Sequence, residues 1–191
     1  MIIERIKGIL IAPKQTWYTI QSEPHTFGQV FTHYAMPLAA IPAFFGMLGY
    51  IFVGIKSGFG ASVYRIPVGT AFVWAIVYYL LTLIGLFLDG IIINAFTQVY
   101  DSEHCAVKAY KLAVYSFTPA FLAGVLNIIP TAGFLVFLIS LTGIYLLYHG
   151  LPVMMQTPRE KLTNYVISVV LAVIILHVIL SGIASLFISL S

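Results

Sequence analysis

The chain contains few charged residues. Only 8% of its 191 residues are Asp, Glu, Lys or Arg, whereas 61% are hydrophobic; a typical soluble domain has about 25% charged and about 45–50% apolar residues. Nine basic and six acidic side chains cannot cover the surface of a soluble domain of this size, and the high apolar content excludes a disordered chain. We therefore expect most of the surface to face lipid.

Cysteine is also scarce. Cys105 is the single one, so the chain can form neither an internal disulfide nor a thiolate zinc centre. The ligand-type residues of the segment 100–105 match neither the HExxH motif nor a calcium-binding loop. The sequence therefore predicts no metal site and no cofactor, and Asp101 or Ser102 is expected to cap the helix that follows.

The apolar residues form long runs with few charges. The charge-free stretch from Leu112 to Pro158 is long enough for two helical spans of about 20 residues each, and Pro130 and Gly133 mark the turn between them. The runs do not alternate with period two, which argues against barrel strands. We therefore predict an all-α integral membrane protein whose membrane domain covers residues 30–191. Five transmembrane helices are expected in this domain, at about 30–53, 67–94, 112–129, 132–155 and 162–187. The segment 54–67 is expected to be a flexible outer loop.

Lysine and arginine predict the orientation of these helices. Five spans would place seven basic residues on the side of the N-terminus and two, Lys56 and Arg65, on the other side. Because basic residues accumulate on the cytoplasmic side, we predict a bacterial inner-membrane protein with a cytoplasmic N-terminus and a periplasmic C-terminus. The basic residues are scattered singly, which suits a surface of anionic lipids rather than a nucleic acid.

Residues 1–29 are predicted to form cytoplasmic interfacial helices before the first span. One face of the first, amphipathic helix is apolar and consists of Ile2, Ile6, Ile9 and Leu10. This face would either lie in the membrane surface or pack under the transmembrane bundle, and we weigh the two equally. Pro13 suits the first turn of a second helix, in which Trp17 and Tyr18 are predicted as anchors at the level of the headgroups.

Asp89 and His177 are the polar residues that stand out within the apolar runs. An acid inside a span is a functional candidate, because placing it at mid-bilayer costs roughly 2.5–3.5 kcal/mol. Asp89 lies about 33 Å along its helix from Pro67, so we favour a solvated position near the cytoplasmic edge over an ion or proton site. His177 lies about 21 Å from that edge, counted from Thr163, and is therefore some 10 Å deeper. We expect no direct Asp89–His177 pair.

Several prolines interrupt the predicted spans. Pro119 lies within the third span, and Pro130 follows Asn127 at its end. A proline frees backbone carbonyls that neighbouring groups must satisfy, both in the broken helices of transporters and in ordinary kinked bundles. Because no cluster of polar residues is visible at mid-membrane, we favour a kinked bundle. His149 is expected near the cytoplasmic end of the fourth span, where it can reach water.

The order and spacing of several short segments resemble a known family. These segments are Ile9–Trp17, His33–Pro42, Ala109–Ala120, Asn127–Pro130 and Ile144–Pro152. Together they are similar to the bacterial branch of the Yip-one domain family, the Ypt-interacting proteins, over nearly the whole chain. The resemblance implies five spans and a cytoplasmic N-terminus. The Asp-Leu-Tyr-Gly-Pro motif of the eukaryotic members, which are associated with prenylated Rab GTPases, is not in this sequence, so the resemblance implies a fold and a location rather than an activity.

These observations favour a membrane scaffold or partner-binding protein without catalytic activity. The alternative is a small transporter or a carrier of a lipid or ion, which would use Asp89 and the proline-broken helices, and a cavity that opens near Asp89 would favour it. A serine hydrolase built from His177, Asp89 and Ser116, Ser140 or Ser168 lacks a nucleophile-elbow motif. Expected partners are the lipid bilayer, anionic lipids, an unidentified membrane or cytoplasmic protein, and a second copy of the chain. The residues singled out as functional candidates are Asp89, His177, Asn127, Pro119, Pro130, Tyr110 and His149.

Overall fold

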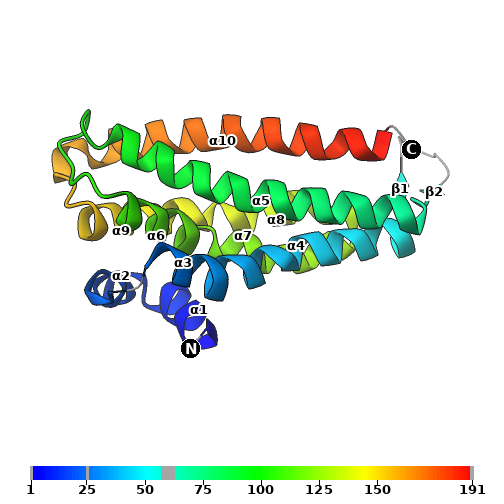
Figure 1. Cartoon of the computed structure of the whole chain (residues 1–191), viewed down its shortest axis with the longest axis horizontal. Helices are drawn as coiled ribbons and strands as arrows, with labels where there is room; N and C mark the ends of the chain where they lie inside the picture. The colour runs from blue at the N-terminus through cyan, green and yellow to red at the C-terminus, as the bar shows by residue number, and fades with distance from the viewer. Residues whose placement is uncertain (1, 25, 57–62, 190–191) are drawn as a thin grey trace.

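Five long apolar helical segments make up the molecule. The computed structural model describes residues 2–24, 26–56 and 63–189. The segments that are long and apolar enough to cross a membrane are Phe27–Val53, Val68–Phe96, Ala106–Ile128, Pro130–Met154 and Arg159–Leu186. The prediction of an all-α fold with five membrane-spanning helices is therefore confirmed. Figure 1 shows these segments along the long axis, and two short helices, α1 (Ile2–Ile11) and α2 (Pro13–Ser22), at the end that we call the N-terminal end.

The first span combines regular and π-helical turns. Its parts are α3 (Phe27–Val30), η1 (Phe31–Ala35), α4 (Met36–Leu48) and η2 (Gly49–Val53). A capping box starts it: Thr26 Oγ1 accepts a hydrogen bond from the Gln29 N–H, and Gln29 Oε1 accepts one from the Thr26 N–H. Within α4, Pro42 lies against Gly124 of the third span, where an added Cβ would lie 2.6 Å from the proline ring. Only glycine allows this close approach.

The third span is broken at Phe117, between α6 (Ala106–Ser116) and α7 (Thr118–Ala123). Pro119 has no N–H, so the carbonyl of Tyr115 loses its helical partner. The Thr118 hydroxyl donates to that carbonyl at 2.7 Å, and Tyr34 of the first span shares a 2.8 Å hydrogen bond with the same hydroxyl. The expected satisfaction of a freed carbonyl by its neighbours is thus found at Pro119.

The third and fourth spans form a helical hairpin, as the sequence predicts. The turn falls at Ile129, which has an extended backbone and separates Ile128 from Pro130. The segments around it are η3 (Gly124–Ile128), η4 (Pro130–Ala132), α8 (Gly133–Ser140) and α9 (Thr142–Met154). Gly49 of the first span packs directly on this turn, since an added Cβ would lie 2.4 Å from the Asn127 carbonyl oxygen.

A short strand pair closes the far end of the bundle. Strands β1 (Ile55–Lys56) and β2 (Val63–Tyr64) are antiparallel. Gly54 precedes them with φ +81°, a conformation that glycine adopts without steric cost. The sequence predicts an irregular loop over 54–67 and no strands. Residues 57–62 of that loop lie outside the described residues.

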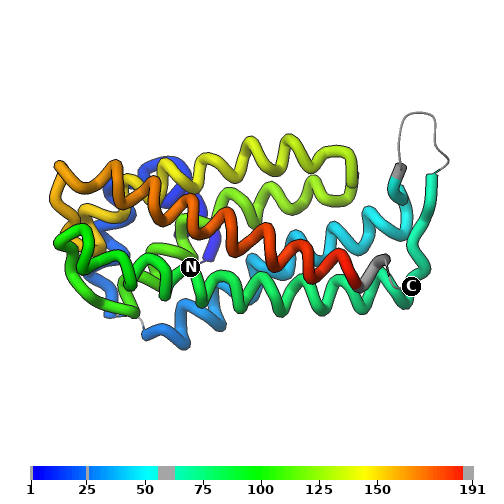
Figure 2. Tube along the Cα trace, turned by 90° about the horizontal axis from the view of Figure 1, so that it is seen from above, coloured from blue at the N-terminus to red at the C-terminus, as the bar shows by residue number. Residues whose placement is uncertain are grey.

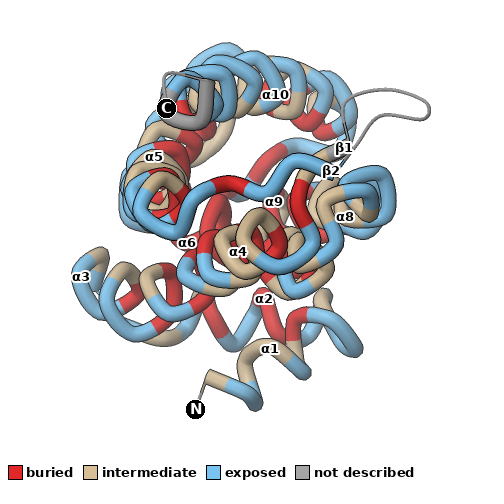
Figure 3. Tube along the Cα trace, turned by 90° about the vertical axis from the view of Figure 1, so that its right-hand side faces the viewer, coloured by how far each residue is buried: buried red, intermediate tan, exposed pale blue. Residues whose placement is uncertain are grey.

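Helix α6 lies at the centre of the bundle. Its residues from Ala109 to Ser116 are all buried, and Figure 3 shows buried segments gathered at the centre of the bundle while the outer faces are exposed. Helix α5 (Val68–Phe96) approaches α6 at Gly90, where an added Cβ would lie 3.0 Å from the Tyr110 Cα. Helix α10 (Arg159–Ser189) packs along α5.

The N-terminal helices are docked on the bundle by Trp17. Its side chain is fully buried, its Nε1–H donates to the Leu146 carbonyl at 3.1 Å, and its ring meets Tyr115 edge to face. The absence of a side chain at Gly150 makes room for the indole, since an added Cβ would lie 2.7 Å from it. The prediction of Trp17 as a headgroup anchor is therefore wrong, whereas Tyr18 is exposed.

The isoleucine face of α1 also packs against the bundle. Ile9 is fully buried, and Ile2 and Ile6 are partly buried against the same core. The fourth residue expected on this face, Leu10, is 43% exposed. Of the two alternatives for the face, packing under the bundle is the one that this geometry supports.

The expected cap of the third span is wrong. Helix α6 begins after Cys105, which makes no side-chain cap. Asp101 instead forms an ion pair with Lys161, and the Ser102 hydroxyl donates to the Thr157 hydroxyl. The segment between α5 and α6 passes the end of α9 and the start of α10. The two contacts hold it in that place.

Candidate functional site

Asp89 and His177 form a direct pair inside the bundle, contrary to the sequence prediction. The imidazole Nε2 lies 2.9 Å from Asp89 Oδ2, a hydrogen bond that the carboxylate accepts. The Asp89 side chain is only 1% exposed, whereas that of His177 is 31% exposed. The pair thus joins the second span to the fifth at a buried position.

Two features of helix geometry explain why depths counted along the two helices do not predict the Asp89–His177 pair. The Tyr165 hydroxyl donates to the Ile93 carbonyl at 2.5 Å, so the early part of α10 lies beside the last turn of α5, and α10 begins beyond the end of α5 (Figure 1). The helices are antiparallel, and helical side chains tilt toward their own N-terminus. Asp89 and His177 therefore lean toward each other, and the expected 10 Å difference in depth disappears.

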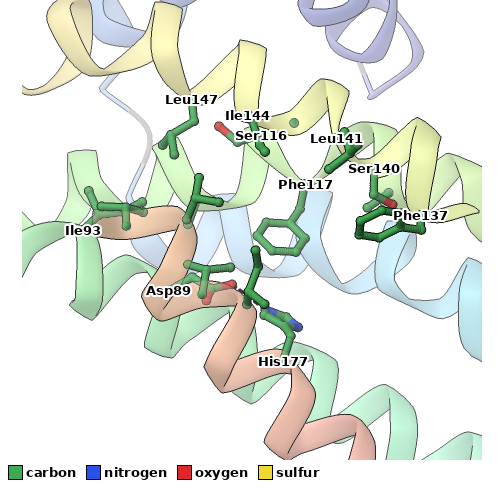
Figure 4. Close-up of a pocket in the computed structure, with 17 residues that line it drawn as sticks. Asp89, Ile93, Ser116, Phe117, Phe137, Ser140, Leu141, Ile144, Leu147 and His177 are labelled. Carbon is green, nitrogen blue, oxygen red and sulfur yellow. Dashed lines mark hydrogen bonds and ion pairs between the residues drawn. The ribbon is translucent and has the colours of Figure 1, made fainter. Parts of the chain in front are cut away.

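A cavity of about 300 Å³ adjoins the pair. Figure 4 shows Asp89 and His177 on one wall and Ser116, Ile144 and Leu147 on the opposite one. Phe117 lies between these walls with its ring stacked on the His177 imidazole, 5.0 Å between centroids. The lining is apolar apart from two serines and the Asp89–His177 pair. Its size is at the lower end of the range of about 300–1,000 Å³ that is typical of ligand pockets.

The cavity opens sideways, between α8 and α10. None of the residues of α8, all of which are described, is buried, and the lining residues Phe137 and Leu141 on that side are about half exposed, as is Ile174 of α10. Figure 2 shows α10 leaving α9 and running toward α5, away from the hairpin that contains α8. In a bilayer this opening faces the lipid chains.

Two residues that line the cavity each contain a buried polar atom with no hydrogen-bond partner among the described residues. These atoms are Asp89 Oδ1 and Ser116 Oγ. Ser140 lines the same cavity, but its hydroxyl donates to the Val136 carbonyl of its own helix at 2.7 Å. Leaving a buried polar group unpaired costs about 1–3 kcal/mol, and Asn94 Oδ1 and the Tyr110 hydroxyl, which lie outside the cavity lining, are unpaired in the same way among the described residues.

The other predicted residues lie elsewhere. Tyr110 packs on Phe27 with 4.2 Å between ring centroids. Asn127 and Pro130 lie at the turn of the hairpin, where the Asn127 amide is 3.5 Å from the Pro42 carbonyl. Pro119 lies at the break of the third span, and His149 makes an edge-to-face contact with Tyr145. Of the predicted residues, the structure thus unites only Asp89 and His177 in one site.

The hydrolase arrangement is not assembled in the part of the chain that the structure describes. His177 uses Nε2 to contact Asp89, and no hydrogen bond joins it to Ser116 or Ser140. Ser168 bonds to Tyr100 at 2.6 Å. Residues 2–24, 26–56 and 63–189 also hold no group of three or more His, Cys, Asp or Glu arranged to bind a metal ion.

Sequence reasoning missed the aromatic and apolar walls of the site. Phe117, Phe137 and Val173 are indistinguishable in sequence from lipid-facing residues. The sequence suggests Ser116 only as a hydrolase nucleophile. The signal that points to it is its position one residue before the break at Phe117, where the end of α6 packs on α9: an added Cβ at Gly143 would lie 2.6 Å from the Ser116 carbonyl oxygen.

The chain is similar to known proteins along nearly its whole length. The Yip1 domain model matches residues 7–181. Inner membrane protein YohC of Escherichia coli strain K12 and the YohC protein of strain CFT073 are each 26% identical over 187 residues, which covers 94% of this chain and 93% of theirs. No solved structure gives a significant match.

Proposed function

The chain belongs to the Yip1 domain family, as its motifs predicted, and on that basis we propose that it is a multi-pass inner-membrane protein that binds the apolar chain of a membrane amphiphile without catalysing a reaction. The location is supported by the names of its relatives, which are inner membrane proteins. The binding role is supported by the cavity beside Asp89, the feature that was expected to favour a carrier over a scaffold.

The cavity suits an alkyl chain for two reasons. Its walls are almost entirely apolar, so they offer a chain the same surroundings as the bilayer. Its opening lies between α8 and α10, so a chain can enter sideways from the membrane without crossing water. The Asp89–His177 pair lies inside the cavity and places a polar group where an amphiphile would carry its headgroup.

Partner binding is the second candidate function. It is supported by apolar side chains on the N-terminal helices that face away from the bundle. These exposed side chains are Ile3, Leu10, Ile11 and Tyr18. A membrane surface or an apolar partner would cover them, and such a scaffold role does not need the cavity.

A photoreactive alkyl probe tests the binding role. Dodecane that carries a diazirine, added to the protein in lipid nanodiscs, is expected to label the cavity walls on α8 and α10. Val173→Trp should abolish this labelling, because Val173 lines the cavity and the larger ring fills it. The matched control is Ile175→Trp, on the lipid-facing side of the same helix and 61% exposed, which should leave the labelling unchanged. Equal labelling in both variants would favour the scaffold.

A further inference from the structure

A second cavity, of about 330 Å³, lies between α1 and the start of the first span. Figure 1 shows α1 beside α3 at the N-terminal end of the bundle. The cavity shares no lining residue with the one beside Asp89, and no acidic residue is among the described residues that line it. Its polar lining residues are Arg5, Gln29, His33, Tyr34 and Tyr115.

Arg5 brings a positive charge into this cavity. One of its terminal nitrogens, Nη2, donates to the Glu23 carboxylate, and the guanidinium lies 5.9 Å from the centroid of the Tyr115 ring, within the range of a cation–π contact. These two contacts hold a side chain that is only 17% exposed. The other terminal nitrogen, Nη1, has no acceptor among the described residues and is open to a water-sized group. Its N–H groups are therefore available to a ligand.

Two further donors line the same cavity. The Gln29 side-chain oxygen accepts from the Thr26 N–H in the capping box, so the NH2 end of this exposed amide is left to donate. Tyr115 is only 5% exposed, but its hydroxyl, which bonds to no described residue, is also open to a water-sized group. Donors thus come from α1, α3 and α6, a combination that suits an anion.

The charges around the cavity also favour an anion. Arg5 contacts the Glu23 carboxylate, and the Lys111 ammonium donates to the main-chain carbonyl of the same residue at 2.9 Å, so two cations accompany one acid. His33 Nδ1 donates to the Gln29 carbonyl at 3.2 Å, which leaves Nε2 to donate when the ring is protonated. An ammonium group would find no carboxylate among the described lining residues.

The depth of the cavity indicates the source of the anion. Gln29 and His33 lie within about 9 Å of Phe27 along the helix, and the first membrane-spanning segment begins at Phe27. Polar headgroup layers make up the difference between a hydrocarbon core of about 30 Å and a bilayer of about 40–45 Å. The cavity therefore lies at the level of the lipid phosphates, and Ile2 and Val30 add apolar walls beside the donors.

We infer that this cavity binds the headgroup of an anionic glycerophospholipid of the phosphatidylglycerol type. The phosphate accepts from Arg5 Nη1, and Gln29 and Tyr115 donate to other oxygens of the same headgroup. A zwitterionic lipid binds more weakly, because its ammonium group has no acidic partner there. The inference goes beyond the proposed function and does not depend on it, since it concerns another cavity.

Native mass spectrometry of the full chain in maltoside micelles measures the selectivity. Phosphatidylglycerol and phosphatidylcholine with the same acyl chains are titrated separately, and the lipid-bound fraction gives an apparent Kd for each. We expect phosphatidylglycerol to bind about tenfold more tightly, because the choline group would leave its charge unpaired. Inorganic phosphate at the same concentrations should give no adduct, because it lacks the acyl chains that hold a lipid at this depth.

Gln29→Glu tests the donor on the first span. The new carboxylate still accepts from the Thr26 N–H, so the cap is kept, but an anionic oxygen that repels the phosphate replaces the NH2 group. The affinity for phosphatidylglycerol should fall about tenfold. The matched control is Gln15→Glu, which makes the same charge change at an exposed position of α2 outside the cavity lining and should change the affinity much less.

Two other variants complete the test. Tyr115→Phe removes a hydroxyl that bonds to no described residue and should weaken phosphatidylglycerol binding about fivefold, so it keeps the test valid if Gln29→Glu fails to fold. Val173→Trp fills the cavity beside Asp89 and should leave phosphatidylglycerol binding unchanged. A failure of this inference is therefore distinguishable from a failure of the proposed function.

Three results would overturn the inference. Equal affinities for phosphatidylglycerol and phosphatidylcholine would mean that the headgroup is not selected. Equal losses in Gln29→Glu and Gln15→Glu would mean that the lipid binds elsewhere on the basic surface. A phosphate adduct that Gln29→Glu abolishes would assign the cavity to a free anion. Selective binding that Gln29→Glu and Tyr115→Phe weaken, and that Gln15→Glu preserves, supports the inference.

Discussion

The Asp89–His177 pair predicts an unequal response to mutation of its two members. His177→Leu leaves Asp89, which is 1% exposed, without a partner for either oxygen. Asp89→Leu leaves His177, which is 31% exposed and still stacked on Phe117. The first change should therefore destabilise the protein much more than the second, even though both remove the same hydrogen bond.

The expected magnitudes follow from burial. Breaking a buried pair at the partner of a carboxylate costs about 3–5 kcal/mol. Removing the carboxylate should cost about 1 kcal/mol, because the group left unpaired is then a partly exposed imidazole stacked on Phe117 rather than a fully buried carboxylate. Replacing both residues by leucine leaves no unpaired polar group and should be close to neutral. The coupling energy of the double-mutant cycle, which is the cost of the double variant minus the costs of the two single variants, should therefore be about 4–6 kcal/mol in magnitude.

Equilibrium unfolding in mixed micelles, with a rising fraction of denaturing detergent, measures the free energies of unfolding of the unaltered protein, the two single variants and the double variant. Thr82→Val is the control, since the Thr82 hydroxyl bonds only within α5, to the Tyr78 carbonyl at 2.8 Å; we expect a change within about 0.5 kcal/mol. Additive effects of the two leucine substitutions, or equal costs for the two single variants, would refute the reasoning, because either result means that the buried carboxylate does not depend on His177.

Three further predictions concern packing and orientation. Trp17→Ala should cost about 3–5 kcal/mol and release the N-terminal helices to limited proteolysis, whereas Tyr18→Ala, which truncates an exposed ring, should not. Gly49→Ala should destabilise the protein by about 1–3 kcal/mol, because the added Cβ meets the Asn127 carbonyl. The control Gly69→Ala, in open space within α5, should be neutral or slightly stabilising. Equal thermal stabilities of the two variants would contradict the packing at the hairpin turn. Reporter fusions after Lys14, Lys108 and Arg159 should read cytoplasmic and a fusion after Ser191 periplasmic, and a cytoplasmic reading at Ser191 would overturn the predicted orientation.

The sequence predicts those features that depend on one segment at a time. Apolar length and the break at Pro130 are enough to place all five spans, because a bilayer imposes nearly the same length on each of them. The freed carbonyl at Pro119 is equally local. The family could be recognised for the same reason, since its motifs are short segments in a fixed order.

Features that depend on how segments slide past one another were predicted wrongly. The Asp89–His177 pair depends on how far α10 extends beyond α5, and span lengths do not determine that offset. Trp17 has the composition of an interfacial anchor, but the absence of a side chain at Gly150, far along the chain, gives it a buried site. The cap at Asp101 failed because Lys161 pairs with its carboxylate. In each case the partner lies on another helix.

The docking of α2 constrains the order in which the molecule is assembled during synthesis. The Trp17 indole and the Gln21 amide donate to the carbonyls of Leu146 and Val153, which follow them by 129 and 132 residues. Trp17 and Gln21 therefore leave the ribosome before their partners on the fourth span, so these two hydrogen bonds form only after that span has been made. During that interval the membrane surface is one apolar surface that could hold the side chains of α1 and α2. The same isoleucine face would then serve twice, first on lipid in the nascent chain and later on protein in the finished bundle.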